Sequence, residues 1–439
     1  MGHARERHLG ERPGLSGYRD ALDRLFQRTG GTWQLGLERV ATLTAQLGHP
    51  ERSFPVFHVA GTNGKGSTVA TLDAVLRGAG LRVGRYMSPH LVDFAERIAV
   101  DGAPAPHDWI ADWLSRHEGL LGELGTTFFE ATTAMAFARF AAAEVDVAVI
   151  EVGLGGRLDA TNVVHPVAAG VTQIGFDHME YLGTTLPRIA AEKAGIYKPG
   201  VGAVVGDAQP EVRAVLQRQA EQVGSHPILV TGRDWDVRDI SVGSGGTRFT
   251  LSDPDGTRDL ATPLVGAFQA HNCAVALGML RSAGGRWAEI GREAGRWLPE
   301  VRLAGRFHRA GQWLFDVAHN ADGAATVVGN VRAVGEDRPV AAVVSVLRDK
   351  DWRGILTSVA SVARPVILTD APTAPASRRW ALREVEAWAI EAGLPVRTID
   401  DFDAALAFAG SLDATVLVTG SFHTVGDAME RLQVDPLAR

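Results

Sequence analysis

The stretch Val59-Ala60-Gly61-Thr62-Asn63-Gly64-Lys65-Gly66-Ser67-Thr68 decides what kind of fold the chain adopts. The apolar end of a strand runs into a glycine-rich turn, and a lysine and two hydroxyl residues then open a helix. Glycines let backbone N–H groups face an anion, the helix N-terminus adds partial positive charge, and Lys65 adds a full charge. We therefore predict a phosphate-binding loop for a nucleoside triphosphate, formed by Asn63, Gly64, Lys65, Gly66 and Ser67.

This loop is a variant of the common phosphate-binding motif, because Gly66 separates Lys65 from the hydroxyl residue that usually follows it directly. The alternative is a glycine-rich strand-to-helix turn with an incidental lysine. The order of strand, loop and helix favours phosphate binding. A second cluster, Gly153-Leu154-Gly155-Gly156, lacks the third glycine of a dinucleotide-binding fingerprint, since Leu158 stands at that position.

Outward from the loop, short apolar runs alternate with helical segments, which is typical of a mostly parallel sheet covered by helices. Residues 234–264 alternate in polarity around a Pro-Asp-Gly turn and predict antiparallel hairpins. The expected strands are 56–60, 145–152, 167–174, 201–205, 313–317, 340–346, 365–370 and 414–419, and the expected helices are 67–78, 186–194, 210–223, 269–283 and 288–298.

The chain has 439 residues, and a single core usually stops growing near roughly 250–300 residues. We predict an α/β protein of two domains. Residues 1–299 form a phosphate-loop-type domain with a mostly parallel sheet and a small antiparallel sheet. Residues 300–439 form a Rossmann-like α/β domain, and a ligand is expected at the seam between the two.

Charge and cysteine content exclude several classes of partner. With 44 Lys and Arg against 51 Asp and Glu, the formal net charge of −7 provides no global positive field for nucleic acid or a membrane surface. Cys273 is the only cysteine, which excludes an intramolecular disulfide and fits a reducing compartment. Because no apolar run reaches the length of a signal peptide or a membrane span, we expect a soluble cytoplasmic protein.

Glu151 is the first candidate for a metal ligand. It ends the strand 145–152, so its carboxylate emerges at the carboxyl edge of the sheet, where ligands of α/β proteins bind. Phosphoryl transfer uses Mg²⁺, which prefers such oxygen ligands. Ser88 and His178 also follow predicted strands and Lys193 lies on a predicted helix, but each of these types is commonly a surface residue.

Further motifs follow the phosphate loop in a fixed order. Their order resembles that of folylpolyglutamate synthases and dihydrofolate synthases, the folate branch of the Mur ligase family, from near Trp33 to the final strand. The motifs are His58–Ser67, Ser88-Pro89-His90-Leu91, Glu96-Arg97-Ile98, Phe129-Glu130-Ala131, Glu151–Asn162, Asp177-His178, Leu182-Gly183, Glu192–Ile196, Gln269 with Asn272, Gly305-Arg306, Asp316–Asn320 and Asp349-Lys350-Asp351.

The resemblance implies an ATP-dependent carboxylate–amine ligase that adds L-glutamate to a folate through an acyl phosphate, with dihydropteroate as a further acceptor left open. It implies ATP and two Mg²⁺ ions, and carbamylation of Lys193. The residues it implies are Lys65, His178 and Lys193 for catalysis; Ser88, Glu151, His178 and Lys193 for metal; Asn272, Arg306 and Asp316 for ATP; Phe128, Phe129, Glu130, Leu158, Asp159 and Ala160 for the acceptor; and His319 near glutamate or the nucleotide.

Some positions depart from the family pattern. Phe268 precedes Gln269 where His is common, and Ala321 follows Asn320 where Pro is common. Gln34, in Trp33-Gln34-Leu35-Gly36-Leu37, replaces an acidic residue of bifunctional members and bears on dihydropteroate use.

Two alternative functions stay open. One is a Mur-type ligase acting on a cell-wall nucleotide peptide, against which Ser88-Pro89-His90-Leu91 and Glu96-Arg97-Ile98 favour the folate branch. The other is a non-catalytic nucleotide-binding regulator, against which the retention of Lys65, Glu151, His178 and Lys193 favours an enzyme. We expect a monomer.

Overall fold

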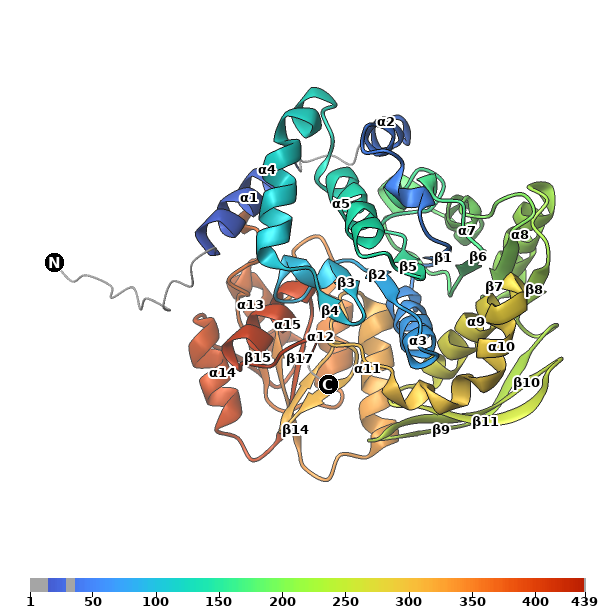
Figure 1. The fold of residues 1–439 in the computed structure, drawn as a ribbon. Coiled ribbons are helices and arrows are strands. Elements are labelled where there is room, and N and C mark those ends of the chain that lie inside the picture. Colours follow the sequence, from blue (N-terminus) through green and yellow to red (C-terminus); the bar gives the residue numbers. More distant parts are fainter. Residues whose placement is uncertain (1–14, 29–35, 438–439) are drawn as a thin grey trace.

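The computed structural model describes residues 15–28 and 36–437. Its first half is built on an eight-stranded sheet in the order β4-β3-β2-β5-β1-β6-β7-β8 (Figure 1). The six strands β2, β5, β1, β6, β7 and β8 are parallel to one another. At one edge of the sheet, β3 pairs antiparallel with β2, and β4 pairs antiparallel with β3. The strands are β1 Val56–Ala60, β2 Val83–Tyr86, β3 Ile98–Val100, β4 Ala103–Pro104, β5 Val147–Glu151, β6 Ala168–Val171, β7 Gly202–Val205 and β8 Ile228–Val230.

Helices cover both faces of this sheet, which is why strand β1 is buried along its whole length. Phe57 and Val59 pack under α3 and α9, whereas Val56 packs toward α5. The helices of this half are α1 Leu15–Gln27, α2 Glu38–Gln46, α3 Lys65–Gly78, α4 His107–Glu123, α5 Phe128–Ala142, α6 Met179–Leu182, α7 Leu186–Ala194, α8 Pro210–Gln222, α9 Ala267–Ala283 and α10 Gly285–Glu293.

A small antiparallel sheet of β9 Asp236–Gly243, β10 Gly246–Asp253 and β11 Gly256–Thr262 covers α9 at the edge of the molecule (Figure 1). Strand β9 also contacts helix α11 of the second half, and Val242 packs against that half's core. The predicted hairpins at 234–264 are therefore confirmed, and they buttress both halves of the chain.

The second half is a six-stranded sheet in the order β12-β13-β17-β14-β15-β16, parallel except for β12. Helices α11 to α13 belong to the core on one face, and α14 and α15 to the core on the other. The elements are β12 His308–Ala310, β13 Trp313–Phe315, α11 Ala321–Val334, β14 Val340–Val344, α12 Trp352–Ala360, β15 Val366–Leu368, α13 Leu382–Glu391, β16 Val396–Thr398, α14 Phe402–Gly410, β17 Thr415–Thr419 and α15 Phe422–Arg431.

The two halves touch at the loop that follows β2. Leu91 packs into the core beside α15, and the backbone of that helix approaches it so closely that a Cβ at Gly426 would lie 2.0 Å from the Leu91 carbonyl oxygen. Only a glycine permits this approach. The loop from Ser88 to Arg97 therefore links the carboxyl edge of the first sheet to the second half.

The predicted α/β class with a small antiparallel sheet is confirmed, and two helix predictions are corrected. Helix α3 begins at Lys65, not at residue 67, because Gly64 takes the left-handed cap position itself. The predicted helix 288–298 is wrong: α10 ends at Glu293 and two 3-10 turns follow, because Gly295 and Pro299 are poor helix residues.

The predicted domain boundary between residues 299 and 300 stays a prediction. The expectations for the first fourteen residues, and for Trp33, Gln34 and Leu35, fall outside the described residues. Within 15–28 and 36–437, no helix combines the length and apolar character needed to cross a membrane.

Two glycine-to-alanine substitutions test the packing of the first half in opposite directions. A Cβ at Gly84 of β2 would lie 2.7 Å from the Phe140 ring, so Gly84→Ala should lower the free energy of unfolding by about 1–3 kcal/mol. Gly119, in α4, has open space around it, so Gly119→Ala should raise stability by about 0.4–1 kcal/mol. Urea unfolding of both variants checks this, and a Gly84→Ala protein as stable as wild type would contradict the packing.

Candidate active site

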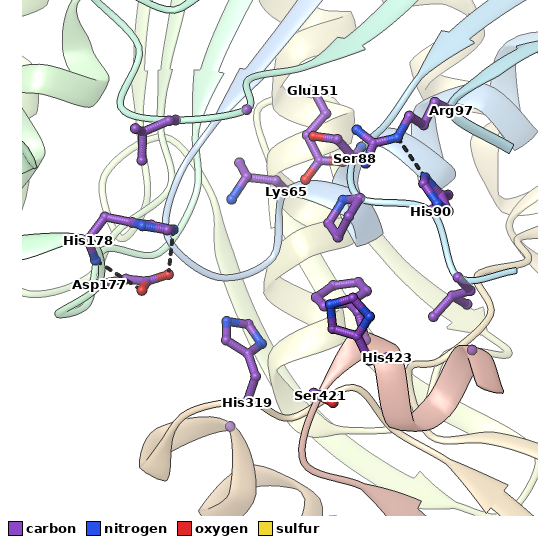
Figure 2. A pocket seen from close by; sticks show the side chains of 18 of the residues that line it. Lys65, Ser88, His90, Arg97, Glu151, Asp177, His178, His319, Ser421 and His423 are labelled. Atoms are coloured by element: carbon purple, nitrogen blue, oxygen red, sulfur yellow. Dashed lines mark hydrogen bonds and ion pairs between the residues drawn. The ribbon is translucent and has the colours of Figure 1, made fainter. Parts of the chain in front are cut away.

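A cavity of about 1470 Å³ opens between the carboxyl edges of the two sheets and takes walls from both halves of the chain (Figure 2). The sequence-predicted residues that line it are Asn63, Gly64, Lys65, Gly66, Ser67, Ser88, Phe128, Phe129, Glu130, Glu151, Leu158, Asp159, Ala160, His178, Asn272, Arg306, Asp316 and His319. Lys193 is the one predicted site residue that is not part of this wall. The expected ligand site at the seam thus coincides with a real cavity.

The phosphate loop has a geometry that only glycine allows. Gly64 has φ +89, and a Cβ there would lie 2.2 Å from Oδ1 of Asn272 on α9. The Lys65 Nζ donates to the carbonyl oxygens of Gly61 at 3.0 Å and Thr62 at 3.2 Å, so the ammonium group is folded over the loop. This cradle of backbone and one cation fits the terminal phosphates of a nucleotide.

Glu151 is a buried carboxylate at the end of β5. It is 5% exposed, and its Oε2 accepts a hydrogen bond from the Ser88 backbone N–H at 3.3 Å. Burial raises the pKa of this carboxyl group, and nearby Lys65 opposes the rise. Figure 2 shows Glu151, Ser88 and Lys65 converging on one side of the cavity.

These residues fit Mg²⁺ in the manner of phosphoryl-transfer enzymes. Mg²⁺ is usually held by one or two carboxylates together with waters and substrate phosphates. Glu151 and Ser88 supply protein oxygens beside the phosphate loop. Across the described ranges, no group of three or more His, Cys, Asp and Glu side chains is placed to hold a metal by itself, so the phosphates would complete the coordination.

His178 and Lys193 approach from another side. His178 has the left-handed φ of 48, and its Nε2 lies 3.6 Å from Asp177. Lys193 sits behind the wall on α7 with 6% exposure, and burial, together with Lys65, lowers its pKa to about 7. A Cβ at Gly156 would lie 2.7 Å from the Lys193 carbonyl oxygen, so the second glycine cluster packs helix α7 against the site.

The second half faces this site with Arg306, Asp316 and His319. The Asp316 carboxylate accepts hydrogen bonds from the backbone N–H groups of Phe307 at 2.9 Å and Ala318 at 3.0 Å, and burial raises its pKa to about 6. Burial, with Arg306 as the next cause, lowers the pKa of His319 to about 4. His319 is therefore a neutral side chain near pH 7.

An aromatic wall forms a further part of the cavity. Phe128 and Phe129 stand at the start of α5, and the Phe26 ring from α1 stacks on Phe128 with centroids 5.2 Å apart. Such a wall suits a flat conjugated ring. The wall joins two helices that are far apart in sequence.

Two carboxylate side chains that were predicted to bind the substrate already have hydrogen-bond partners inside the protein. Glu130 accepts from the Arg39 guanidinium at 3.1 Å and from the Thr127 backbone N–H at 2.8 Å, which closes the capping box of α5. Asp159 accepts from the Leu154 N–H at 2.8 Å and from Thr161. Both side chains hold the walls in shape, and their contact with substrate stays a prediction.

The cavity also contains charged and polar residues that were not among the sequence-predicted site residues. They include His90, Arg97, Lys350, Arg378, Ser421 and His423. Lys350 of the second half forms an ion pair with Asp177 of the first at 3.7 Å. His90 and Arg97 lie in the motifs Ser88-Pro89-His90-Leu91 and Glu96-Arg97-Ile98 named above. Ser421 follows the end of β17 after one glycine, and a position at a strand end is the signal that identified Glu151.

Comparison with known proteins assigns the chain to a class. Residues 107–280 match the Mur ligase middle domain and residues 305–422 match the Mur ligase glutamate ligase domain. A dihydrofolate synthase/folylpolyglutamate synthase of Escherichia coli is 38% identical over 423 residues, covering 95% of each chain.

Solved structures agree. The Mycobacterium tuberculosis folylpolyglutamate synthase complexed with ADP has a TM-score of 0.85 at 33% identity, covering 96% of this chain and 100% of that one. A bifunctional folylpolyglutamate synthase/dihydrofolate synthase with Mn, AMPPNP and L-glutamate bound has a TM-score of 0.80 at 32% identity, covering 96% and 98%.

The fold and the phosphate site therefore define an ATP-dependent Mur-type ligase. Within that class, the chain belongs to the folylpolyglutamate synthase/dihydrofolate synthase family.

The phosphate loop generates a direct test. Gly64→Ala should weaken binding of Mg-ADP by at least roughly 10-fold, since the added methyl group collides with Asn272 and displaces the loop. Isothermal titration calorimetry measures the affinity.

Gly80→Ala is the matched control, because Gly80 shares the positive φ, at +86, but has open space around it. Both variants carry backbone strain of about 1 kcal/mol. Equal nucleotide affinity in the two would show that the collision does not matter.

Proposed function

We propose that this protein is an ATP-dependent ligase that joins L-glutamate to the carboxylate of a folate, and that dihydropteroate is also an acceptor. The observation that supports this most is the composition of the cavity. One continuous space is bounded by the phosphate loop with Glu151, by the aromatic wall at Phe128, and by Asp316 and His319 of the second half. The relatives named above carry the same activities in their names.

The reaction has two steps. A carboxylate oxygen of the acceptor attacks the γ-phosphorus of ATP, and the bond to the ADP oxygen breaks, which gives an acyl phosphate and ADP. The amino nitrogen of glutamate then attacks the acyl carbon, the carbon–oxygen bond to phosphate breaks, and the amine loses a proton. The products are an amide, phosphate and ADP, so no protein nucleophile is required.

The protein contributes position and charge. Asn63 and the backbone N–H groups of the loop hold the nucleotide phosphates, and Lys65 stabilises negative charge on the transferred group. Arg306 and Asn272 complete nucleotide binding from across the cavity, and Asp316 holds the nucleoside. Closure of the second half excludes water from the acyl phosphate.

The metal proposal places Ser88 and Glu151 on one Mg²⁺ ion and His178 with Lys193 on a second. Bound Mg²⁺ supplies charge neutralisation on the phosphates. Carbamylation would convert the Lys193 amine into an oxygen donor suited to this ion. Its support is the pKa of about 7, lowered first by burial, which leaves a sizeable neutral amine fraction near neutral pH.

A cell-wall nucleotide peptide is a weaker candidate acceptor, because the wall at Phe128 and Phe26 suits a flat ring. A non-catalytic regulator would not need the buried charged groups of Glu151 and Lys193, because removing them from water costs free energy. The cytoplasmic location and the monomeric state stay predictions.

Activity is tested by measuring ADP release from MgATP in the presence of L-glutamate, with tetrahydrofolate and dihydropteroate as parallel acceptors. We expect glutamate-dependent turnover with both, and Lys65→Ala should reduce kcat by roughly 100-fold or more, as loss of a preorganised charge does. Mass spectrometry of the product confirms the added glutamate. Silence with both acceptors would reject the proposed function.

The state of Lys193 is tested separately with ¹³C-labelled bicarbonate. Because its pKa is lowered to about 7, the ammonium form dominates below that pH and cannot react with CO₂. The carbamate signal in ¹³C NMR, and any bicarbonate stimulation of activity, should therefore grow as pH rises from about 6 to about 8.

Lys193→Met should abolish that signal and reduce kcat by roughly 100-fold, because a metal ligand is lost. Lys198→Met is the control, since Lys198 lies on the same segment and donates to the Asn162 carbonyl oxygen. A signal that survives in Lys193→Met and disappears in Lys198→Met would place the carbamate on Lys198 and contradict the proposal.

A further inference from the structure

Arg97 is a buried cation on the wall of the cavity that the mechanism above does not use. It ends the 3-10 turn Phe94–Arg97, is 8% exposed and lines the cavity (Figure 2). Removing a guanidinium group from water is unfavourable unless an anion or strong acceptors replace the lost hydration. A buried arginine at a cavity wall therefore raises the question of which anion it serves.

The contacts of Arg97 within the chain leave much of its guanidinium unused. Nε donates to Nδ1 of His90 at 2.8 Å, so His90 is an acceptor at that nitrogen. The guanidinium carbon lies 5.2 Å from the Phe128 ring centroid and 5.9 Å from that of Phe94. Within residues 15–28 and 36–437, no carboxylate forms an ion pair with Arg97, and no hydrogen bond engages its two terminal nitrogens.

The turn that carries Arg97 is rigidly held. The Glu96 carboxylate accepts from the backbone N–H groups of Leu91 at 2.9 Å and Val92 at 2.8 Å. Asp93 caps the turn and accepts from the Tyr18 hydroxyl of α1 at 2.7 Å. A cation fixed in advance binds its ligand with little loss of conformational entropy.

The position of Arg97 in the cavity indicates which anionic group of the reactants it binds. The nucleotide phosphates belong to the loop at Lys65, and Lys350 lies on the opposite, second-half wall. Arg97 stands between the aromatic wall at Phe128 and the Glu151 carboxylate, whose electrostatic partners include both Lys65 and Arg97. A ligand that stacks on Phe128 and points toward the phosphate loop passes Arg97.

Resting on the proposed function, we propose that Arg97 binds the benzoate-type carboxylate of dihydropteroate and holds it for attack on the γ-phosphate. The two terminal N–H groups of a guanidinium match the spacing of carboxylate oxygens. Arg97 thereby determines specificity for the short, rigid acceptor whose carboxylate sits directly on an aromatic ring. Phe128 contacts that ring, and His90 fixes the guanidinium plane.

The experiment removes the charge from each partner in turn. Calorimetry measures the binding of dihydropteroate, and of its analogue with hydrogen in place of the carboxylate, to the Mg-ADP-loaded protein. Wild type should bind the acid about 10- to 100-fold more tightly than the analogue, as expected for hydrogen bonds to charged groups. In Arg97→Gln this ratio should fall to near one, with the analogue's affinity almost unchanged, and Arg97→Lys should restore part of it.

Arg85→Gln is the matched control. Arg85 is equally buried, at 8% exposure, but it faces Asp73 at 3.6 Å and does not line the cavity. It should keep the wild-type ratio even if stability falls, and unchanged Mg-ADP affinity shows that each variant is folded.

Equal loss of acid and analogue in Arg97→Gln would overturn the inference and assign Arg97 a purely structural role. Turnover of tetrahydrofolate by a wild-type protein that does not bind dihydropteroate would also overturn it, while leaving folate ligation intact. Absence of turnover with either acceptor would instead reject the proposed function itself.

Discussion

The contact between Gly64 and Asn272 couples the phosphate loop to helix α9, and the layout of the cavity depends on it. The left-handed turn at Gly64 ends the transition from β1 and starts α3, and there is no space for a side chain between it and Asn272. Helix α9 in turn packs beneath the small antiparallel sheet, which touches the second half of the chain. The left-handed backbone at Gly64 thus sets the position of α9 relative to the phosphate loop, and through the small sheet it influences the position of the second half.

The shifted pKa values of the basic groups in and beside the cavity have two causes, which are burial and the closeness of other cations. Lys65 lowers the pKa of Lys193 after burial does, and Arg306 acts in the same direction on His319. A polyphosphate would relieve this repulsion, because it places several negative charges among the cations. Burial first, and Lys65 second, therefore keep Lys193 partly neutral near pH 7, which is the state that the proposed carbamylation requires.

The sequence indicated the phosphate loop and Glu151 because each depends on local order: a strand, then a glycine-rich turn or a terminal carboxylate. Three-dimensional partners could not be seen in that way. Glu130 and Asp159 appear as free carboxylates in the sequence, but Arg39 and Thr161 occupy them in the structure. Arg97 shows the reverse: among the described residues no carboxylate forms an ion pair with it, and that follows from the folded environment and from no sequence pattern.

The loop between Ser88 and Arg97 connects acceptor binding with closure of the two halves. At its start, the Ser88 N–H contacts Glu151; in its middle, Leu91 packs into the second-half core beside α15. At its end, Arg97 faces the cavity. Because the backbone at Leu91 is packed tightly against Gly426, a displacement of the second half would act directly on the loop that carries Arg97. In the proposed mechanism, the closure that excludes water would therefore act on the same loop that carries Arg97, which would link acceptor binding to protection of the acyl phosphate from hydrolysis.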